Sequence, residues 1–316
     1  MTAPTTTAPR TPGGATTTGD GRRRTRPTRA SSAPGVSAGR TGGGRARGAL
    51  LGLVAWVVGL LFFAPVAWMV LTSLHSETSA ATNPPSVFAP LTLDGYANFF
   101  GANSGASPWP PLINSASASI VSTLLVLCLA LPAAYALSIR PVKKWSDVMF
   151  FFLSTKMLPM VAGLLPIYLI AKQVGALDSV GLLIVLYTSM NLPIAVWMLR
   201  SFLSEIPVEI LEAAALDGAN LLSIFRRVIV PISGPGLAAT ALICFIFSWN
   251  ELLFASVLTG TQAITAPVFL TGFVTSQGLF LAKVCAAAVA VSFPVLVAGF
   301  AAQDKLVQGL SLGAVK

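Results

Sequence analysis

The residue types that carry most enzyme chemistry are scarce in this sequence of 316 residues. It has one histidine and three cysteines, and Cys128, Cys244 and Cys285 all fall within apolar runs without metal-ligand spacing. No Ser or Cys nucleophile stands beside a base, and no His/Asp/Glu cluster suits a metal. We therefore predict no catalytic site, no metal site and no cofactor. A membrane-embedded enzyme is kept as an alternative class.

Two charged side chains lie away from the ends of apolar segments, at membrane depth, where charge is costly. An ionisable residue within a membrane span is a functional-site hypothesis by default, and Lys156 and Glu251 fit that description. Asn191, Trp249 and Asn250 could add hydrogen bonds and ring stacking for a hydroxyl-rich solute. We take these five residues as candidates for a substrate path. The alternative is that the charges pair within the bundle or extend to a membrane interface.

A polar interruption from Glu205 to Pro231 separates two strongly apolar segments. Ser204 and Pro207 suit the start of a helix, and Gly218, which tolerates positive φ, predicts a sharp turn. A second helix is predicted to begin near Asn220 and to stop at Pro231. In the first helix, a helical wheel separates an acidic stripe from a small, apolar side: Glu205, Glu209 and Glu212 opposite Val208, Leu211, Ala214 and Ala215.

Such a pair of helices is too short and too polar to cross a membrane. One alternative is an amphipathic helix held in the lipid interface. The run of alanines, the abrupt glycine and the clustered acids favour docking into another protein, because small side chains allow close approach and acids can meet Arg or Lys.

The rest of the chain determines where this element lies. The composition is 54% hydrophobic and only 10% charged, with a mean hydropathy of +0.78, whereas soluble domains are about a quarter charged. The sequence therefore predicts an all-α integral membrane protein with about six spans, near residues 49–74, 113–137, 148–170, 180–203, 235–258 and 282–302.

The net charge of +9 arises mainly from the N-terminal tail and short loops. This distribution follows the positive-inside rule and indicates orientation, not nucleic-acid binding. Both termini and the polar interruption are predicted to be cytoplasmic. We expect residues 1–48 to form a disordered Arg-rich tail, 49–112 the first span with an external loop, 113–303 a five-helix domain and 304–316 a C-terminal tail.

The polar interruption also resembles a known motif. Glu212-Ala213-Ala214, Gly218 and Pro231 match the EAA loop of permease subunits in binding-protein-dependent ABC importers, with Val228 and Val230 as conservative departures in its aliphatic positions. Three further stretches agree with the smaller permease subunit of the maltose-type carbohydrate branch: Tyr135–Ser138 with Arg140, Trp249–Glu251 and Gln308–Lys316. Two others resemble sugar-alcohol (polyol) members: Ser154–Pro159 and Ser276–Phe280.

This resemblance implies the type I importer fold in a bacterial inner membrane, with the EAA loop (residues 205–231) as a cytoplasmic coupling helix. The implied partners are a second permease subunit, two ATP-binding subunits, an external solute-binding protein, membrane lipid and a carbohydrate substrate. The implied ATPase-coupling residues are Glu212, Ala213, Ala214, Asp217, Gly218 and Pro231. Because no Walker A motif occurs, ATP hydrolysis is expected in a partner. An ion-coupled transporter is a further alternative, but it would need intramembrane carboxylates, and Glu251 is nearly alone.

Overall fold

The structure is a computed structural model that describes residues 42–82, 86–101, 107–139, 142–275 and 278–314. Its contacts divide the chain into two units, residues 1–57 and residues 58–316, and each is described by itself. Helix α1 (Gly42–Ser73) crosses the boundary and begins earlier than the predicted span at residue 49. The rest of the predicted disordered tail, residues 1–41, lies outside the described residues.

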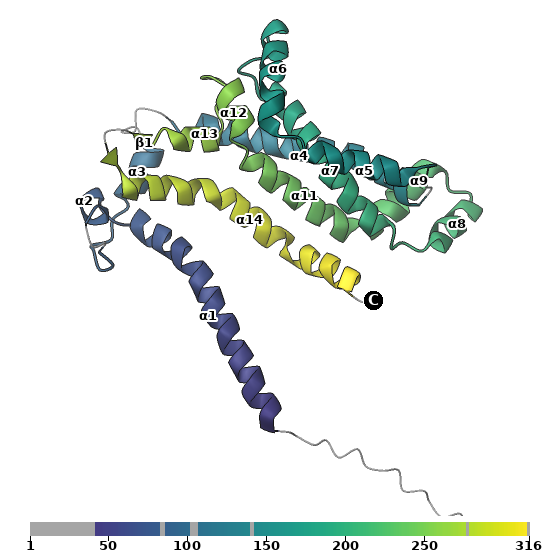
Figure 1. The fold of residues 1–316 in the computed structure, drawn as a ribbon, viewed down its shortest axis with the longest axis horizontal. Coiled ribbons are helices and arrows are strands. Elements are labelled where there is room, and N and C mark those ends of the chain that lie inside the picture. The colour runs from purple at the N-terminus through teal and green to yellow at the C-terminus, as the bar shows by residue number, and fades with distance from the viewer. Residues whose placement is uncertain (1–41, 83–85, 102–106, 140–141, 276–277, 315–316) are drawn as a thin grey trace, which may run out of the picture. The chain divides into compact units, whose positions relative to one another are not determined.

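The larger unit is almost entirely helical (Figure 1). Its helices are α2 (Glu77–Ala80), α3 (Asp94–Phe100), α4 (Trp109–Ser138), α5 (Trp145–Lys156), α6 (Met160–Gln173), α7 (Val180–Leu203), α8 (Val208–Leu216), α9 (Leu221–Ile224), the π-helix η2 (Phe225–Ile229), α10 (Val230–Ile232), α11 (Gly234–Trp249), α12 (Leu253–Leu258), α13 (Ala266–Thr271) and α14 (Leu281–Ala314). An antiparallel ribbon joins β1 (Val274–Thr275) to β2 (Gly278–Leu279). The predicted all-α class is confirmed, with this ribbon as a small addition.

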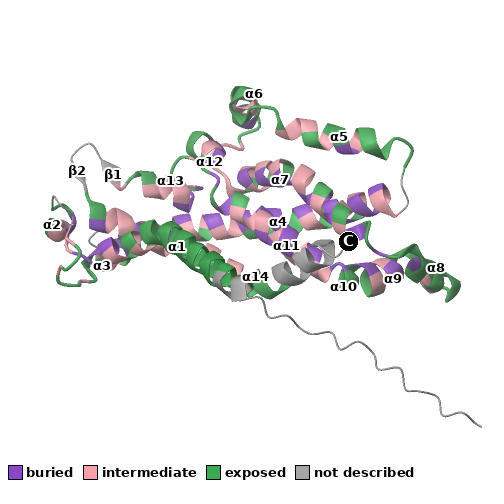
Figure 2. Ribbon diagram, turned by 60° about the horizontal axis from the view of Figure 1, so that its bottom comes forward, coloured by how far each residue is buried: buried purple, intermediate pink, exposed green. Residues whose placement is uncertain are grey.

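Helices α4, α7 and α11 pack side by side, and α14 lies along α11 (Figure 1). Buried residues concentrate on these helices (Figure 2). Small side chains such as Ala118, Ser119 and Ser122 are fully or almost fully buried on α4, which permits the close helix approach that is typical of membrane bundles. This packed group is the frame that positions every site discussed below.

Four of the described helices are long and apolar enough to cross a membrane, and two bent pairs raise the number to six if each pair is one span. One bend and one break correct two predicted spans. The segment expected at 148–170 bends by 83° between α5 and α6, where Pro159 precedes α6. The segment expected at 235–258 ends at Trp249 and resumes as α12 at Leu253. Pro159 has no backbone N–H to continue the hydrogen bonds of α5, so that helix ends before it. At the second break, the buried Glu251 carboxylate accepts hydrogen bonds from the first N–H groups of α12 and so begins a new helix there.

Two predicted ends also differ from the structure. Pro231 does not stop the second helix of the polar interruption, because helical backbone continues from Leu221 to Ile232 and turns by 76° only before Gly234. The π-helical turn η2 precedes this proline, in keeping with the lost hydrogen bond there. Helix α14 continues to Ala314, through most of the segment expected to be a tail.

Candidate functional site

The segment from Val208 to Ile232 contains the residues that resemble the EAA loop, and we call it the coupling element after that resemblance alone. It is attached to the bundle along one side. Leu211, Ile224 and Ile229 are buried in one hydrophobic cluster with residues of α4 and α7. The Phe225 ring stands edge-on to the Tyr135 ring of α4, with centroids 4.9 Å apart. The apolar residues of the element therefore anchor it to the same core that holds the long helices together.

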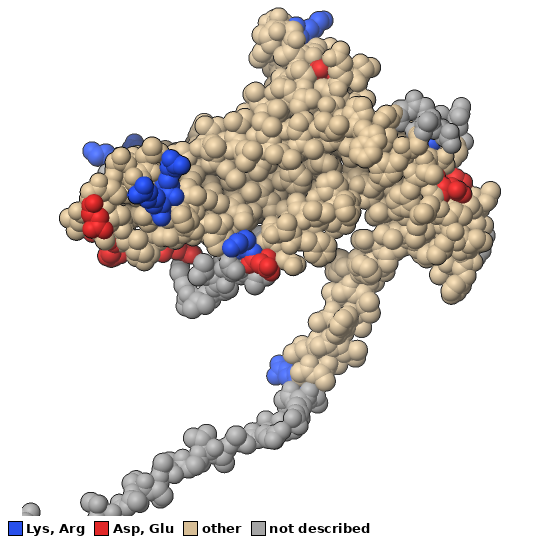
Figure 3. All heavy atoms as spheres, turned by 180° about the vertical axis from the view of Figure 1, so that it is seen from behind, with Lys and Arg blue, Asp and Glu red and all other residues tan. Residues whose placement is uncertain are grey.

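The outer surface of the coupling element carries acidic side chains on α8 and its turn, exposed Arg226 and Arg227 on η2, and apolar residues. Glu209, Glu212 and Asp217 are exposed, and acidic and basic side chains gather near the end of the bundle that carries α8, while most of the visible face is uncharged (Figure 3). Leu216 is 89% exposed and Leu222 is 66% exposed. Sequence reasoning did not predict that these two leucines would be exposed. A helix as short as α8 can bury only part of its apolar surface.

Gly218 makes the turn between the two parts of the element, as predicted. Its φ is +80°, and a Cβ built there would meet no atom within 4 Å. The need for glycine is therefore one of backbone conformation and not of space. Asn220 begins α9, and its side-chain oxygen accepts a hydrogen bond from the Ser223 N–H at 2.9 Å. Two local signals, one glycine and one cap, thus fix the change of direction.

Lys156 ends α5 beside the 83° bend. It lines a cavity of about 480 Å³ that is bounded by α6, α7 and Phe254 of α12. Lys156 is half-buried, and none of the described residues forms a hydrogen bond or ion pair with it. Of the five substrate-path candidates, only Lys156 lines this cavity.

Asn191 lies in the centre of the bundle and is fully buried. Its Nδ2 donates to the Ser248 Oγ at 2.9 Å, and the Ser248 Oγ is 3.2 Å from the Ser122 Oγ. This chain joins α7, α11 and α4, as interhelical hydrogen bonds do where water is absent. The Oδ1 of Asn191 is buried without a partner among the described residues.

The run Trp249–Asn250–Glu251 builds the break between α11 and α12. The Trp249 Nε1 donates to the Val291 carbonyl of α14 at 3.2 Å, and the Asn250 Nδ2 donates to the Ile246 carbonyl at 2.8 Å. The buried Glu251 carboxylate accepts from the Phe254 and Ala255 N–H groups at 2.9 and 3.2 Å. These groups therefore hold the fold together at this break, and a role for them in the substrate path stays a prediction.

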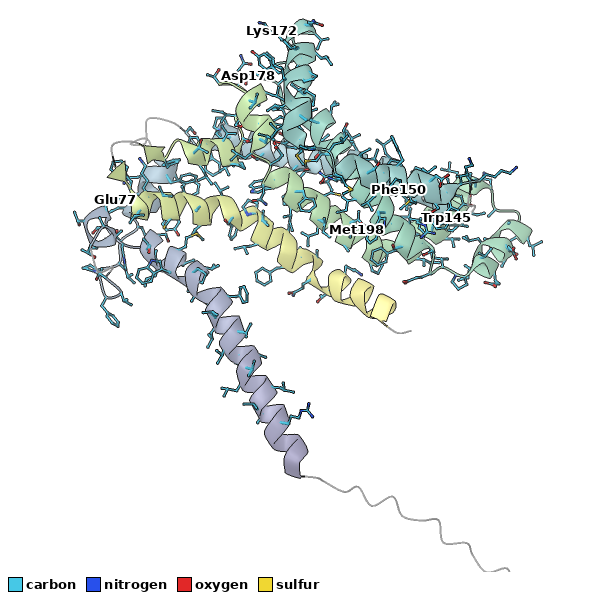
Figure 4. All side chains as sticks on the ribbon, viewed as in Figure 1. Glu77, Trp145, Phe150, Lys172, Asp178 and Met198 are labelled. Carbon is cyan, nitrogen blue, oxygen red and sulfur yellow. The ribbon has the colours of Figure 1, made fainter. Side chains whose placement is uncertain are left out.

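A second carboxylate joins distant loops. Asp178, between α6 and α7, lies close to α12 (Figure 4) and accepts four backbone hydrogen bonds of 2.8–3.1 Å from residues 260–263. Desolvation raises the pKa of the Asp178 carboxyl, but the four donors outweigh it and lower the pKa to about 2. Sequence reasoning did not identify this residue, since its partners lie far along the chain.

Comparison with known proteins gives this geometry a context. Residues 126–310 match the family described as binding-protein-dependent transport system inner membrane component. A probable ABC transporter permease protein of Sinorhizobium fredii is 36% identical over 268 residues, which are 84% of this chain and 95% of the relative. A trehalose transport system permease protein of Mycobacterium tuberculosis is 34% identical over 80% of this chain and 92% of its own length.

A solved structure has the same fold. It is described as a bacterial ABC transporter involved in the import of the acidic polysaccharide alginate, and one of its chains matches with a TM-score of 0.69 at 21% identity. The match covers 83% of this chain and 97% of the other chain. At this identity the likeness establishes the fold alone.

Proposed function

The chain belongs to the family of binding-protein-dependent transport system inner membrane components, and we propose that it forms half of the path for a carbohydrate in an ATP-driven importer. As an ABC importer permease it is a non-catalytic membrane subunit. In our proposal the coupling element receives the motion of an ATP-hydrolysing partner and transmits it to the helices that surround the solute.

The exposed coupling element is the observation that carries this proposal. Acidic side chains and exposed leucines stand together on its outer surface, so a partner could pair with the charges and bury the apolar groups. On the inner side, Leu211, Ile224 and Ile229 share the core of α4 and α7. A displacement of α8 would therefore be passed to two long helices through close-packed side chains. The coupling residues in this proposal are Glu212, Ala213, Ala214, Asp217, Gly218 and Pro231.

The assembly that we propose contains a second, different permease subunit and two ATP-binding subunits. An external solute-binding protein delivers the substrate, and the chain spans a bacterial inner membrane with both termini in the cytoplasm. The support for this orientation is the positive charge of the tail, of Arg140, Lys143 and Lys144 before α5, and of Arg226 and Arg227 within η2. The Arg-rich tail is proposed to fix orientation and to take no part in transport.

A carbohydrate is proposed as the substrate because one relative is named for trehalose transport. The resemblance of several motifs to the maltose-type branch supports the same class. Sugar alcohols belong to it too, and Ser154–Pro159 resembles polyol members.

Reconstituted proteoliposomes test this function. We expect carbohydrate uptake that requires both ATP and the solute-binding protein, and we expect Glu212→Lys to abolish uptake and to reduce co-purification of the ATPase at least about tenfold. Asp94→Lys, which changes an exposed acid at the start of α3, in the segment proposed to be external, is the control and should retain the ATPase. Uptake that continues without ATP would instead identify an ion-coupled transporter, and solute turnover without transport would identify an enzyme.

A further inference from the structure

The cavity beside Lys156 is built by two interrupted helices. Its floor is the bend between α5 and α6, and its walls include Ser189 and Met190 of α7 and Phe254 of α12. Interrupted helices are a common way to place a polar group inside a membrane protein. A volume of about 480 Å³ falls within the usual range for small-molecule sites, and an apolar lining with few polar groups is also typical of them.

Within the part of the chain that the structure describes, Lys156 is the only charged residue that lines this cavity. The two hydroxyls beside it donate to carbonyls of their own helices, Thr155 to Phe152 at 2.7 Å and Ser189 to Val185 at 3.0 Å. Met160, at the start of α6, lines the cavity too, and no side chain caps that helix start. The helix dipole there has the same sign as the lysine. Lys156 also ends α5, whose dipole end has the opposite sign, so the positive charge of the cavity lining comes from the lysine itself.

Carboxylates on the neighbouring elements are occupied elsewhere. Glu251, which precedes α12, accepts from two backbone N–H groups, and Asp178, which precedes α7, accepts from four. Asp147 lies at the opposite end of α5 from Lys156, about 13 Å away along the helix. A cation in an apolar segment without a counter-charge is unfavourable. Something outside the described part of the chain is expected to supply the negative charge.

We propose that this cavity receives the acidic group of the transported solute, so that the substrate class is a carbohydrate bearing a carboxylate or a sulfonate. The inference rests on the proposed function of the chain as a permease subunit. The ammonium group of Lys156 pairs with the anion, and Phe254, Met190 and Leu186 contact the apolar faces of the sugar ring. Neutral sugars would leave the charge without a partner and would be disfavoured.

The sign of the electrostatic potential in the cavity can be measured without knowing the solute. In the assembled transporter with Cys128, Cys244 and Cys285 replaced by Ala, Ser189→Cys is treated with thiosulfonate reagents that carry either a sulfonate or a trimethylammonium group. We expect the sulfonate reagent to react faster, and Lys156→Gln to lower the ratio of the two rates at least about fivefold. Lys156→Arg should keep the ratio.

Ser256→Cys is the matched control, because Ser256 is exposed on α12 and does not line the cavity. Its ratio of rates should not respond to Lys156→Gln. The proposal is overturned if the ratio of labelling rates at Ser189→Cys is the same with and without Lys156→Gln. It is also overturned if neither reagent labels the Ser189→Cys thiol, either with or without ATP. Retention of the ATPase by each variant shows that the protein is folded and assembled.

A lipid phosphate could supply the same anion, so the labelling is repeated in phosphatidylcholine vesicles with and without phosphatidylglycerol. The proposal predicts no difference. If phosphatidylglycerol blocks the labelling of Ser189→Cys, and Lys156→Gln removes this block, the cavity binds lipid and the proposal is overturned.

Uptake then tests the substrate class. We compare a disaccharide that contains glucuronate with trehalose, which is neutral, and expect Lys156→Gln to reduce uptake of the acidic sugar at least about tenfold. Uptake of neutral sugars alone, unchanged by Lys156→Gln, would overturn this inference while leaving the proposed function intact. Absence of ATP-dependent uptake of any carbohydrate would instead overturn the proposed function.

Discussion

The coupling element and the break at Trp249–Glu251 are both polar interruptions of an apolar chain, but their polar groups are used in opposite ways. Around Glu212 the acids are exposed, and the apolar Leu216 is exposed beside them. Around Glu251 each polar side chain is hydrogen-bonded to backbone within the bundle. The first region is incomplete without a partner, whereas the second is complete within the chain.

This contrast shows that a charge in a membrane protein does not by itself mark a functional site. A buried carboxylate that accepts two N–H groups stabilises a helix start where no water can do so. An exposed carboxylate contributes little to the fold and is free to contact a partner. The two glutamates should therefore respond differently to the same substitution.

The largest effect is expected for Glu251→Ala. Removing the carboxylate leaves buried N–H groups at the start of α12 without acceptors, so the free energy of unfolding should fall by about 2–3 kcal/mol. Glu212→Ala, the matched variant, should change it by less than about 0.5 kcal/mol. Denaturant titration of the purified protein in detergent measures both, and equal losses would contradict the comparison.

Gly218→Val should have the next largest effect. The φ of +80° disfavours a β-branched residue by about 2 kcal/mol, so the turn should distort and ATP-dependent uptake should be lost. Gly218→Asn should be milder, because asparagine tolerates positive φ. Gly181→Ala in α7, where a Cβ would meet nothing within 4 Å, is the control. Normal uptake by Gly218→Val would show that the turn is not required.

Leu216→Ala tests whether the exposed apolar residue serves the partner. We expect the affinity for the ATPase to fall about fivefold, or about 1 kcal/mol, while the free energy of unfolding stays unchanged, because Leu216 is 89% exposed in the chain itself. Val257→Ala, an exposed change outside the coupling element, should leave ATPase binding unaltered. If Leu216→Ala lowers the free energy of unfolding but leaves the affinity for the ATPase unchanged, Leu216 stabilises the fold and does not contact the partner.

The smallest of these effects is expected for Asp178→Asn, which should lower the free energy of unfolding modestly at neutral pH, where the carboxylate is ionised, and should differ less and less from the unchanged protein as the pH falls. Because the folded pKa of about 2 lies below the usual 3.8, the ionised carboxylate contributes stability above about pH 4, and this contribution is lost as the pH falls from about 4 through about 2. The variant should lack that part of the acid response. Parallel stability curves for the two proteins across this interval would contradict the account.

Much of the fold was predictable because its signals are local. Long apolar segments identified the helices, and Gly218 with Asn220 located the turn within the coupling element. The helix cap formed by Glu251 could also have been predicted from the sequence, because its carboxylate accepts hydrogen bonds from N–H groups only three and four residues later in the chain. The prediction passed over it because a charge in an apolar segment was taken as a sign of substrate binding.

The sequence by itself determined the membrane class, the family motif and the positions of the polar interruptions, since these depend on composition and short spacings. Only the tertiary structure decided which polar groups are satisfied within the chain. The hydrogen bond from Trp249 to Val291 and the four bonds that Asp178 accepts join residues far apart in sequence, and the cavity beside Lys156 exists only because α5 bends toward α6 near α7 and α12. Such partners are set by packing, which no local pattern records.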